Sequence, residues 1–226
     1  MKRATKRRPV RGQFITLEGP EGSGKSTHIR HLAAALRRLG YRVVQTREPG
    51  GTVVAEAIRQ TLLRSSSREQ ITPIAESLLI FAARSQHVRH VIEPALQCGA
   101  IVLCDRFSDS TFAYQGFARG LDLAWLRTAN SLATNGCGPN LTLLLDVPVH
   151  IGLSRRRKSG GKQNRLDLES VRFHRLVRKG FLTLAAQSPR RIRVIRADRS
   201  EETTKAEIEA VVLGWLRTRQ HSSRTR

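Results

Sequence analysis

The sequence predicts an α/β protein in which helices flank an open, five-stranded parallel sheet in three layers, with a small lid. Three observations predict this class. Short apolar runs of strand length alternate with helical stretches, the pattern of βαβ units and a parallel sheet. The first strand is followed by a glycine-rich turn that opens a helix. The 226 residues suit one domain with a lid, and no apolar run reaches the ~20 residues that a membrane span needs.

The first half of the chain is expected to contain three strands. Residues 14–18 are apolar, residues 41–46 are β-branched and aromatic, and residues 100–104 are apolar again. The helices expected between them are residues 25–39, 53–63 and 73–97. Gly40 suits the C-cap of the first helix, and Pro73 suits the first turn of the third. Pro94 predicts a kink or a new start near the end of that long helix.

The second half is expected to contain two more strands, residues 141–146 and 192–195. The expected helices are residues 108–115, 122–134, 149–157, 169–186 and 201–216. Residues 158–164 are polar and carry Gly160–Gly161, so we expect a mobile loop there, within a lid at about residues 154–167.

The charge of the chain is strongly positive and unevenly distributed. The net charge is +22, but residues 12–151 hold fourteen basic and eleven acidic residues, whereas residues 152–196 hold fourteen and two. We expect a basic arm at 1–11 and a basic tail at 217–226, both disordered, around a folded domain at 12–216. Because no aromatic residues are interleaved with the basic ones as stacking platforms, a nucleic-acid partner is disfavoured.

The cysteines indicate a reducing compartment. Cys98, Cys104 and Cys137 are odd in number and lack metal-ligand spacing, so free thiols are expected. The basic residues 1–11 are not followed by a hydrophobic segment and do not resemble a secretory signal. We therefore expect a cytoplasmic protein without a membrane partner.

A phosphate-binding motif follows the first strand. Residues 19–26 match G-x-x-x-x-G-K-[ST] between a predicted strand and a predicted helix, the context that the motif requires. Glycines let the backbone N–H groups converge on phosphate oxygens at the start of a helix. The expected ligands of the triphosphate are Gly19, Pro20, Glu21, Gly22, Ser23, Gly24, Lys25, Ser26 and Thr27. The predicted architecture is then that of a P-loop NTPase, with Lys25 on the β- and γ-phosphates.

An acidic residue and an arginine follow the third predicted strand. Since ligands of open parallel sheets sit beyond the carboxyl ends of the strands, Asp105 is placed to hold Mg²⁺ together with Ser26. Arg106 is placed to hold an anion, although a helix-capping Asp105 beside a solvated Arg106 is the alternative.

The basic lid is a candidate source of catalytic charge. Arginines that close over transferring phosphates stabilise the negative charge of the transition state. The candidates are Arg155, Arg157 and Arg165, and the sequence leaves open which of them reaches the γ-phosphate. The alternative is that this stretch is only a solvated charge run.

The chain resembles the thymidylate kinase family from about Phe14 to Leu216. Four segments carry the resemblance: residues 17–27 (LEGPEGSGKST), 46–51 (TREPGG), 105–116 (DRFSDSTFAYQG) and 173–181 (FHRLVRKGF). The second and third are the specific ones. The resemblance implies a P-loop kinase domain that transfers the γ-phosphoryl group of ATP to dTMP with Mg²⁺, in the bacterial arrangement with lid arginines and usually as a homodimer.

The resemblance also implies roles for single residues. Arg47, beside Arg106, is implied to bind the acceptor phosphate and to be catalytic with it and Lys25. Glu21 is implied near the acceptor sugar, Arg84 on the thymine ring, and Asp105 near Mg²⁺. Further residues implied around the base and sugar are Thr111, Tyr114 and Gln115.

Three positions depart from the family pattern. Ile80 stands where the family usually has a Phe that stacks on the base, and Phe81 follows it, turned by ~100° around the helix. Asn164 and Arg196 replace usual acids. We count both Ile80 and Phe81 as candidate base contacts. The alternatives that remain are a kinase for another nucleoside monophosphate and a P-loop NTPase stimulated by nucleic acid.

Overall fold

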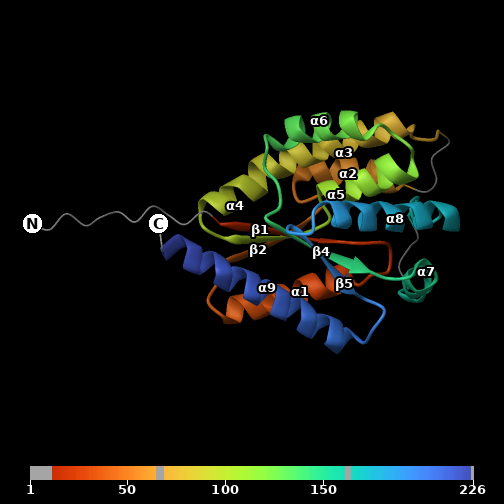
Figure 1. Ribbon diagram of the computed structural model, residues 1–226. Helices are drawn as coiled ribbons and strands as arrows, with labels where there is room; N and C mark the ends of the chain where they lie inside the picture. The colour runs from red at the N-terminus through yellow and green to blue at the C-terminus, as the bar shows by residue number, and fades with distance from the viewer. Residues whose placement is uncertain (1–11, 65–68, 161–163, 225–226) are drawn as a thin grey trace, which may run out of the picture.

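The computed structural model describes residues 12–64, 69–160 and 164–224. Its centre is a sheet of five parallel strands in the order β2-β3-β1-β4-β5 (Figure 1). The strands are β1 Gln13–Glu18, β2 Val43–Arg47, β3 Ile101–Asp105, β4 Leu141–Asp146 and β5 Ile192–Arg196. The five-stranded parallel sheet predicted from the sequence is therefore confirmed. The central strands read as continuous apolar runs because helices bury both of their faces.

Helices cover the two faces of the sheet. Helices α1 (Lys25–Arg38) and α9 (Glu201–Arg224) lie on one face, and α3 (Pro73–His87), α4 (Glu93–Gln97) and α8 (Val171–Gln187) lie on the other (Figure 1). The remaining helical segments are α2 Val53–Leu63, η1 Val88–Ile92, α5 Ser108–Thr111, η2 Phe112–Ala118, α6 Leu123–Thr134 and α7 Val149–Lys158.

Two predicted helices are interrupted by π-helical turns. The predicted helix 73–97 divides into α3, the π-helix η1 and α4. Pro94, near the start of α4, has no N–H for the regular helical ladder, which accounts for a break in this region. The predicted helix 108–115 is a single α-turn followed by the π-helix η2, for which the sequence holds no marker.

The C-terminal prediction needs a correction. Helix α9 continues to Arg224, so residues 217–224 are helical and not a disordered tail. Local contacts support the extension, since the Arg219 guanidinium lies 4.7 Å from the centre of the Trp215 ring and the Thr218 hydroxyl donates to the Trp215 carbonyl. The basic arm 1–11 and residues 225–226 lie outside the described residues.

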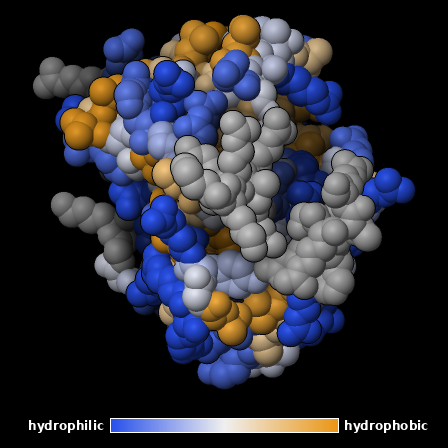
Figure 2. Space-filling model, turned by 90° about the vertical axis from the view of Figure 1, so that its left-hand side faces the viewer, coloured by the Kyte–Doolittle hydropathy of each residue, from blue (hydrophilic) through white to orange (hydrophobic). Residues whose placement is uncertain are grey.

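The surface at the left of Figure 1, seen face-on in Figure 2, is mostly hydrophilic where its residues are coloured, with separate apolar areas near the upper and lower edges. In the described part of the chain, every helix is too short or too polar to cross a membrane.

The fold brings three strand ends to one place. Glu18, Arg47 and Asp105 end the adjacent strands β1, β2 and β3 at their carboxyl side. Glycine is required where the chain turns from β1 into α1, because a Cβ on Gly19 would lie 2.4 Å from the Leu145 carbonyl oxygen and its φ is +143°. The candidate site lies at these strand ends, beside the turn.

Candidate active site

Lys25 occupies the centre of the phosphate-binding turn. It is the first residue of α1, and its ammonium donates to the carbonyls of Gly19 (3.0 Å) and Pro20 (2.9 Å) and to the Ser23 hydroxyl (3.1 Å). Burial, together with the nearby positive charge of Arg106, lowers the pKa of Lys25 to about 8. With this pKa the ammonium is still mostly protonated near neutral pH, so Lys25 places a positive charge inside the turn, where the N–H groups of the loop and of the α1 N-terminus converge.

Ser26 and Asp105 meet beside this turn. The Ser26 hydroxyl donates to Oδ2 of Asp105 at 2.7 Å. Two hard oxygen ligands next to a phosphate site suit Mg²⁺, which takes one or two protein ligands and completes its shell with phosphate and water. In the part of the chain that the structure describes, no three His, Cys, Asp or Glu side chains form a metal cage of their own. The donor set thus fits a metal that arrives with a nucleotide.

Arg106 connects the phosphate-binding turn with the neighbouring cavity. Its guanidinium donates to Glu21 Oε1 (2.9 Å), to the Gly19 carbonyl (3.1 Å) and to the Ser110 hydroxyl (3.1 Å). Its φ of +70° is rare for a residue with a side chain, a kind of strain that collects at functional sites. Burial opposes the charge of Glu21, but Arg106, Lys25 and the Tyr114 hydroxyl outweigh it and lower the Glu21 pKa to about 2.

Glu18 supports this strained turn from inside the protein. The carboxylate is fully buried and accepts from the backbone N–H of Phe107 (2.7 Å) and from the hydroxyl of Ser110 (2.6 Å). Burial and the neighbouring Asp109 raise the pKa of Glu18 to about 8. Sequence reasoning did not select Glu18, although an acid that ends an apolar strand was a usable signal.

Among the described residues, five arginines from four parts of the chain line a cleft beside Lys25: Arg47, Arg59, Arg106, Arg155 and Arg156. Arg47 donates to both Glu56 carboxylate oxygens at 2.9 Å, and Arg59 donates to the Pro49 carbonyl. Such a concentration of guanidinium groups is suited to phosphate oxygens. Arg59 was not among the predicted site residues, because an isolated arginine on a helix gives no sequence signal. Arg156 was not selected either, because it lies in the basic run 155–158 and nothing in that run distinguishes it from its neighbours.

The three predicted lid arginines separate in the structure. Arg155 lines the cleft, and its guanidinium donates to the Ala197 carbonyl at 2.6 Å. Arg157 is exposed and does not line the cleft. Arg165 is outside the cleft as well, since it donates to Glu76 and to the Leu62 carbonyl. Arg156 faces the cleft while pairing through two hydrogen bonds with Asp167. Residues 161–163 of the lid lie outside the described residues.

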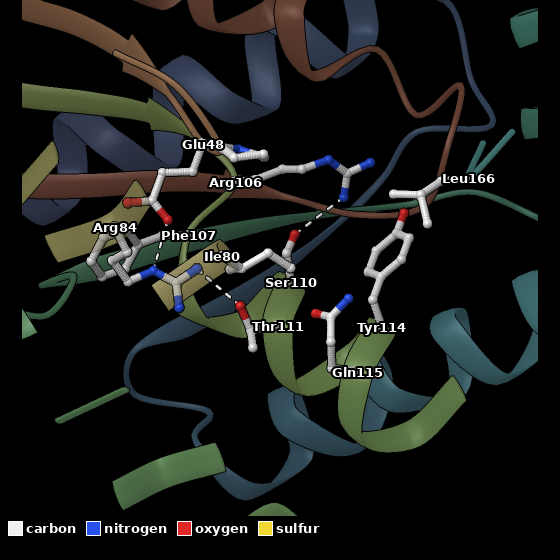
Figure 3. A pocket seen from close by; sticks show the side chains of 11 residues that line it. Glu48, Ile80, Arg84, Arg106, Phe107, Ser110, Thr111, Tyr114, Gln115 and Leu166 are labelled. Atoms are coloured by element: carbon white, nitrogen blue, oxygen red, sulfur yellow. Dashed lines mark hydrogen bonds and ion pairs between the residues drawn. The ribbon is translucent and has the colours of Figure 1, made fainter. Parts of the chain in front are cut away.

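A second cavity adjoins the cleft, and Arg106 lines both (Figure 3). Its predicted members are Ile80, Arg84, Arg106, Thr111, Tyr114 and Gln115, and it also holds Glu48, Pro49, Phe107, Ser110 and Leu166. Phe81 does not line it. The Phe81 ring turns to Trp125, 6.1 Å away between ring centres, as the ~100° step from Ile80 requires.

Arg84 forms the polar end of this cavity. It is 2% exposed and donates to Glu48 (2.7 Å), Asn130 (2.8 Å) and Thr111 (2.9 Å). Its guanidinium lies 5.0 Å from the centre of the Phe107 ring. Figure 3 shows Arg84, Glu48 and Thr111 joined in this way at one side of the cavity. An orienting group is thereby fixed beside an aromatic ring, a typical combination in ligand sites.

Tyr114 and Gln115 stand on the other side of the cavity (Figure 3). The Tyr114 hydroxyl donates to Glu21 Oε1 at 2.7 Å, and the Gln115 amide donates to Glu76 at 2.6 Å. Of the missed cavity residues, Glu48 precedes a cis peptide bond to Pro49 in the T-R-E-P-G-G segment, and Phe107 directly follows Arg106. Each of them is adjacent in sequence to a predicted site residue, Glu48 to Arg47 and Phe107 to Arg106, and this adjacency was the signal that could have identified them.

The fold and these two adjoining sites define a P-loop phosphotransferase with a separate acceptor cavity. Residues 17–208 match the thymidylate kinase family. The chain belongs to that family. Its reaction is accordingly the phosphorylation of dTMP to dTDP at the expense of ATP, which confirms the function predicted from the sequence.

Individual relatives agree over most of the chain. A thymidylate kinase of Geotalea uraniireducens is 48% identical over 210 residues, which cover 91% of this chain and 98% of that protein. One of Syntrophotalea carbinolica is 52% identical over 190 residues, which cover 82% and 88%. The crystal structure of the Ehrlichia chaffeensis enzyme superposes with a TM-score of 0.72 at 33% identity, covering 89% of this chain and 98% of that one.

Proposed function

We propose that the turn 19–27 holds the triphosphate of ATP and that Lys25 neutralises its β- and γ-phosphates. Ser26 and Asp105 would hold Mg²⁺, which supplies charge neutralisation on the phosphate oxygens when it is bound. The hydrogen bonds that the Lys25 ammonium now makes to its own loop keep it positioned for phosphate oxygens. The 2.7 Å contact between Ser26 and Asp105 supports their joint role.

The acceptor dTMP is proposed to occupy the cavity beside Arg106. The thymine ring would lie between Ile80 and Phe107, with Arg84 at its polar edge, and the sugar near Tyr114. The phosphate would reach toward the arginine-lined cleft, within range of Arg47 and Arg106. Ile80 then provides an aliphatic contact in place of the usual stacking ring.

The single observation that carries this assignment is the position of Arg106. Among the described residues, it is the one cation that lines both the acceptor cavity and the cleft that contains Lys25. An acceptor phosphate at Arg106 is thus directed at the terminal phosphate of ATP. Since a phosphate oxygen is already ionised near neutral pH, the transfer needs positioning and charge neutralisation, and we assign no general base. Arg155 and Arg156 are the lid cations placed to add charge.

A homodimer is proposed from the resemblance and from exposed apolar side chains. On α2, Val53 is 91% exposed and Val54 51%, and on α3, Ile74 and Leu78 are 47% and 54% exposed. Apolar residues on adjacent helices are typical of a subunit interface. The free thiols of Cys98, Cys104 and Cys137 support a reducing, cytoplasmic compartment.

The assignment is tested by measuring ADP production from ATP and Mg²⁺ with dTMP, dUMP, UMP, CMP, AMP and thymidine offered separately. We expect strong preference for dTMP, with Lys25→Ala and Arg47→Ala each losing most of the activity while their melting temperatures stay near that of the wild type. Near-normal turnover in either folded variant would contradict the role of that residue.

A further inference from the structure

Glu76, in the first turn of α3, carries a buried carboxylate that is bonded from several sides. The residue is 2% exposed. Its Oε1 accepts from the Gln115 amide at 2.6 Å, and its Oε2 accepts from Arg165 and, at 3.4 Å, from Arg119. Removing a partner from such a buried ionic cluster is costly, so these groups hold one another in place. Glu76 lines neither the acceptor cavity nor the phosphate cleft.

One of these partners belongs to the lid. Arg165 also donates through Nε to the Leu62 carbonyl at 3.2 Å, and its backbone N–H donates to the Leu63 carbonyl at 3.4 Å. The lid segment 164–167 is therefore attached to the end of α2 and, through Glu76, to the start of α3. Because the Arg165 guanidinium is engaged there, it is turned away from the phosphate cleft.

The contacts of Glu76 lead to two walls of the acceptor cavity. Gln115 lines the cavity and is bonded to Glu76 directly, and Leu166 lines it next to Arg165 in the chain. Figure 3 shows Gln115 and Leu166 on the same side of the cavity, with Tyr114 between them and Arg84 opposite. A single buried carboxylate thus supports both a side chain from η2 and the lid.

We propose that Glu76 is a positioning residue that anchors lid residues 164–167 beside the acceptor cavity through Arg165 and holds Gln115 in the cavity wall. Binding of dTMP depends on Glu76 although Glu76 does not touch dTMP. Arg165 is then the anchor of the lid and not a cation of the transition state. The inference rests on the placement of dTMP proposed above.

The test compares Glu76→Gln, Arg165→Gln and the double variant with the wild type, whose dTMP kinase activity is measured first. The matched control is Glu169→Gln, because Glu169 also pairs with Arg119 (2.6 Å) but contacts neither Gln115 nor Arg165 in the described residues. KM for dTMP, KM for ATP, kcat and the melting temperature are measured for each.

We expect KM for dTMP to rise about tenfold or more in Glu76→Gln and Arg165→Gln, the effect of one lost hydrogen bond between charged groups. KM for ATP should stay within about twofold of the wild-type value, because the substitutions weaken the binding of dTMP and not that of ATP. The double variant should be no worse than the poorer single one, and Glu169→Gln should change little. A purely structural role would lower the melting temperature without this selective change in KM.

Two results would overturn the proposal. The first is a loss confined to kcat in Arg165→Gln, which would return Arg165 to the transition state. The second is an unchanged KM for dTMP in a folded Glu76→Gln protein. If Glu76→Gln does not fold, the KM for dTMP of Arg165→Gln tests the proposal by itself. The Arg165 side chain is partly exposed, so its replacement should disturb folding less than that of the buried Glu76. Absence of dTMP kinase activity in the wild type would instead refute the proposed function.

Discussion

Replacement of Arg84 by methionine tests whether the polar end of the acceptor cavity also stabilises the fold. Arg84 and Glu48 are 2% and 5% exposed and are joined at 2.7 Å. With the guanidinium gone, Glu48 keeps His87 as a neighbour, whose Nδ1 lies 3.0 Å away, but loses its permanent cation. Breaking a buried pair from one side costs about 3–5 kcal/mol. For a domain of this size each 1 kcal/mol lowers the melting temperature by about 2–4 °C, so we expect a fall of roughly 6–20 °C.

The matched control is Arg47→Met. It removes an arginine from a pair with Glu56 whose side chains are 53% and 37% exposed, and such surface pairs contribute about 0–1 kcal/mol. Thermal unfolding followed by circular dichroism, without ligands and at one protein concentration, compares the two variants. Arg84→Met should be much less stable than Arg47→Met, although both should lose activity. Equal melting temperatures would refute the argument that burial makes the Arg84–Glu48 pair important.

Two further predictions concern Glu18 and Ile80. The pKa of Glu18 is about 8 in the folded protein against 4.5 in the unfolded chain, so between these pH values the folded protein keeps a proton that the unfolded chain loses. The stabilisation of the folded state by this proton is fully present below pH 4.5 and is lost as the pH rises toward 8. The free energy of unfolding from urea titrations should therefore fall between pH 5 and 8 more steeply in the wild type than in Glu18→Gln, and parallel profiles would contradict the assignment. Ile80→Ala should raise KM for dTMP by about 10-fold or more through lost apolar contact, with KM for ATP unchanged in steady-state assays; an unchanged KM for dTMP would show that the thymine lies elsewhere.

The site could be predicted from sequence wherever its geometry is local. In residues 19–26, the spacing of glycines, lysine and serine places Lys25 at the start of α1, because the turn and the helix are formed by neighbouring residues. Asp105 was found for a similar reason, since the carboxyl ends of parallel strands meet at one edge of the sheet. The alternation of strands and helices likewise predicted the parallel sheet, and in most cases the element ends coincide with the predicted ones or differ by one or two residues.

Side-chain direction and distant partners were decided only by the tertiary structure. Ile80 and Phe81 are adjacent in sequence, but packing against Trp125 turns Phe81 away and leaves Ile80 in the cavity. The arginine-rich lid was recognisable from composition, yet only its packing separates Arg155, which lines the cleft, from Arg165, which is bound by Glu76 on a helix 89 residues earlier. Sequence patterns determine which backbone segments form and how they connect. Which side chains meet depends on contacts between segments far apart in the chain, and no local spacing records them.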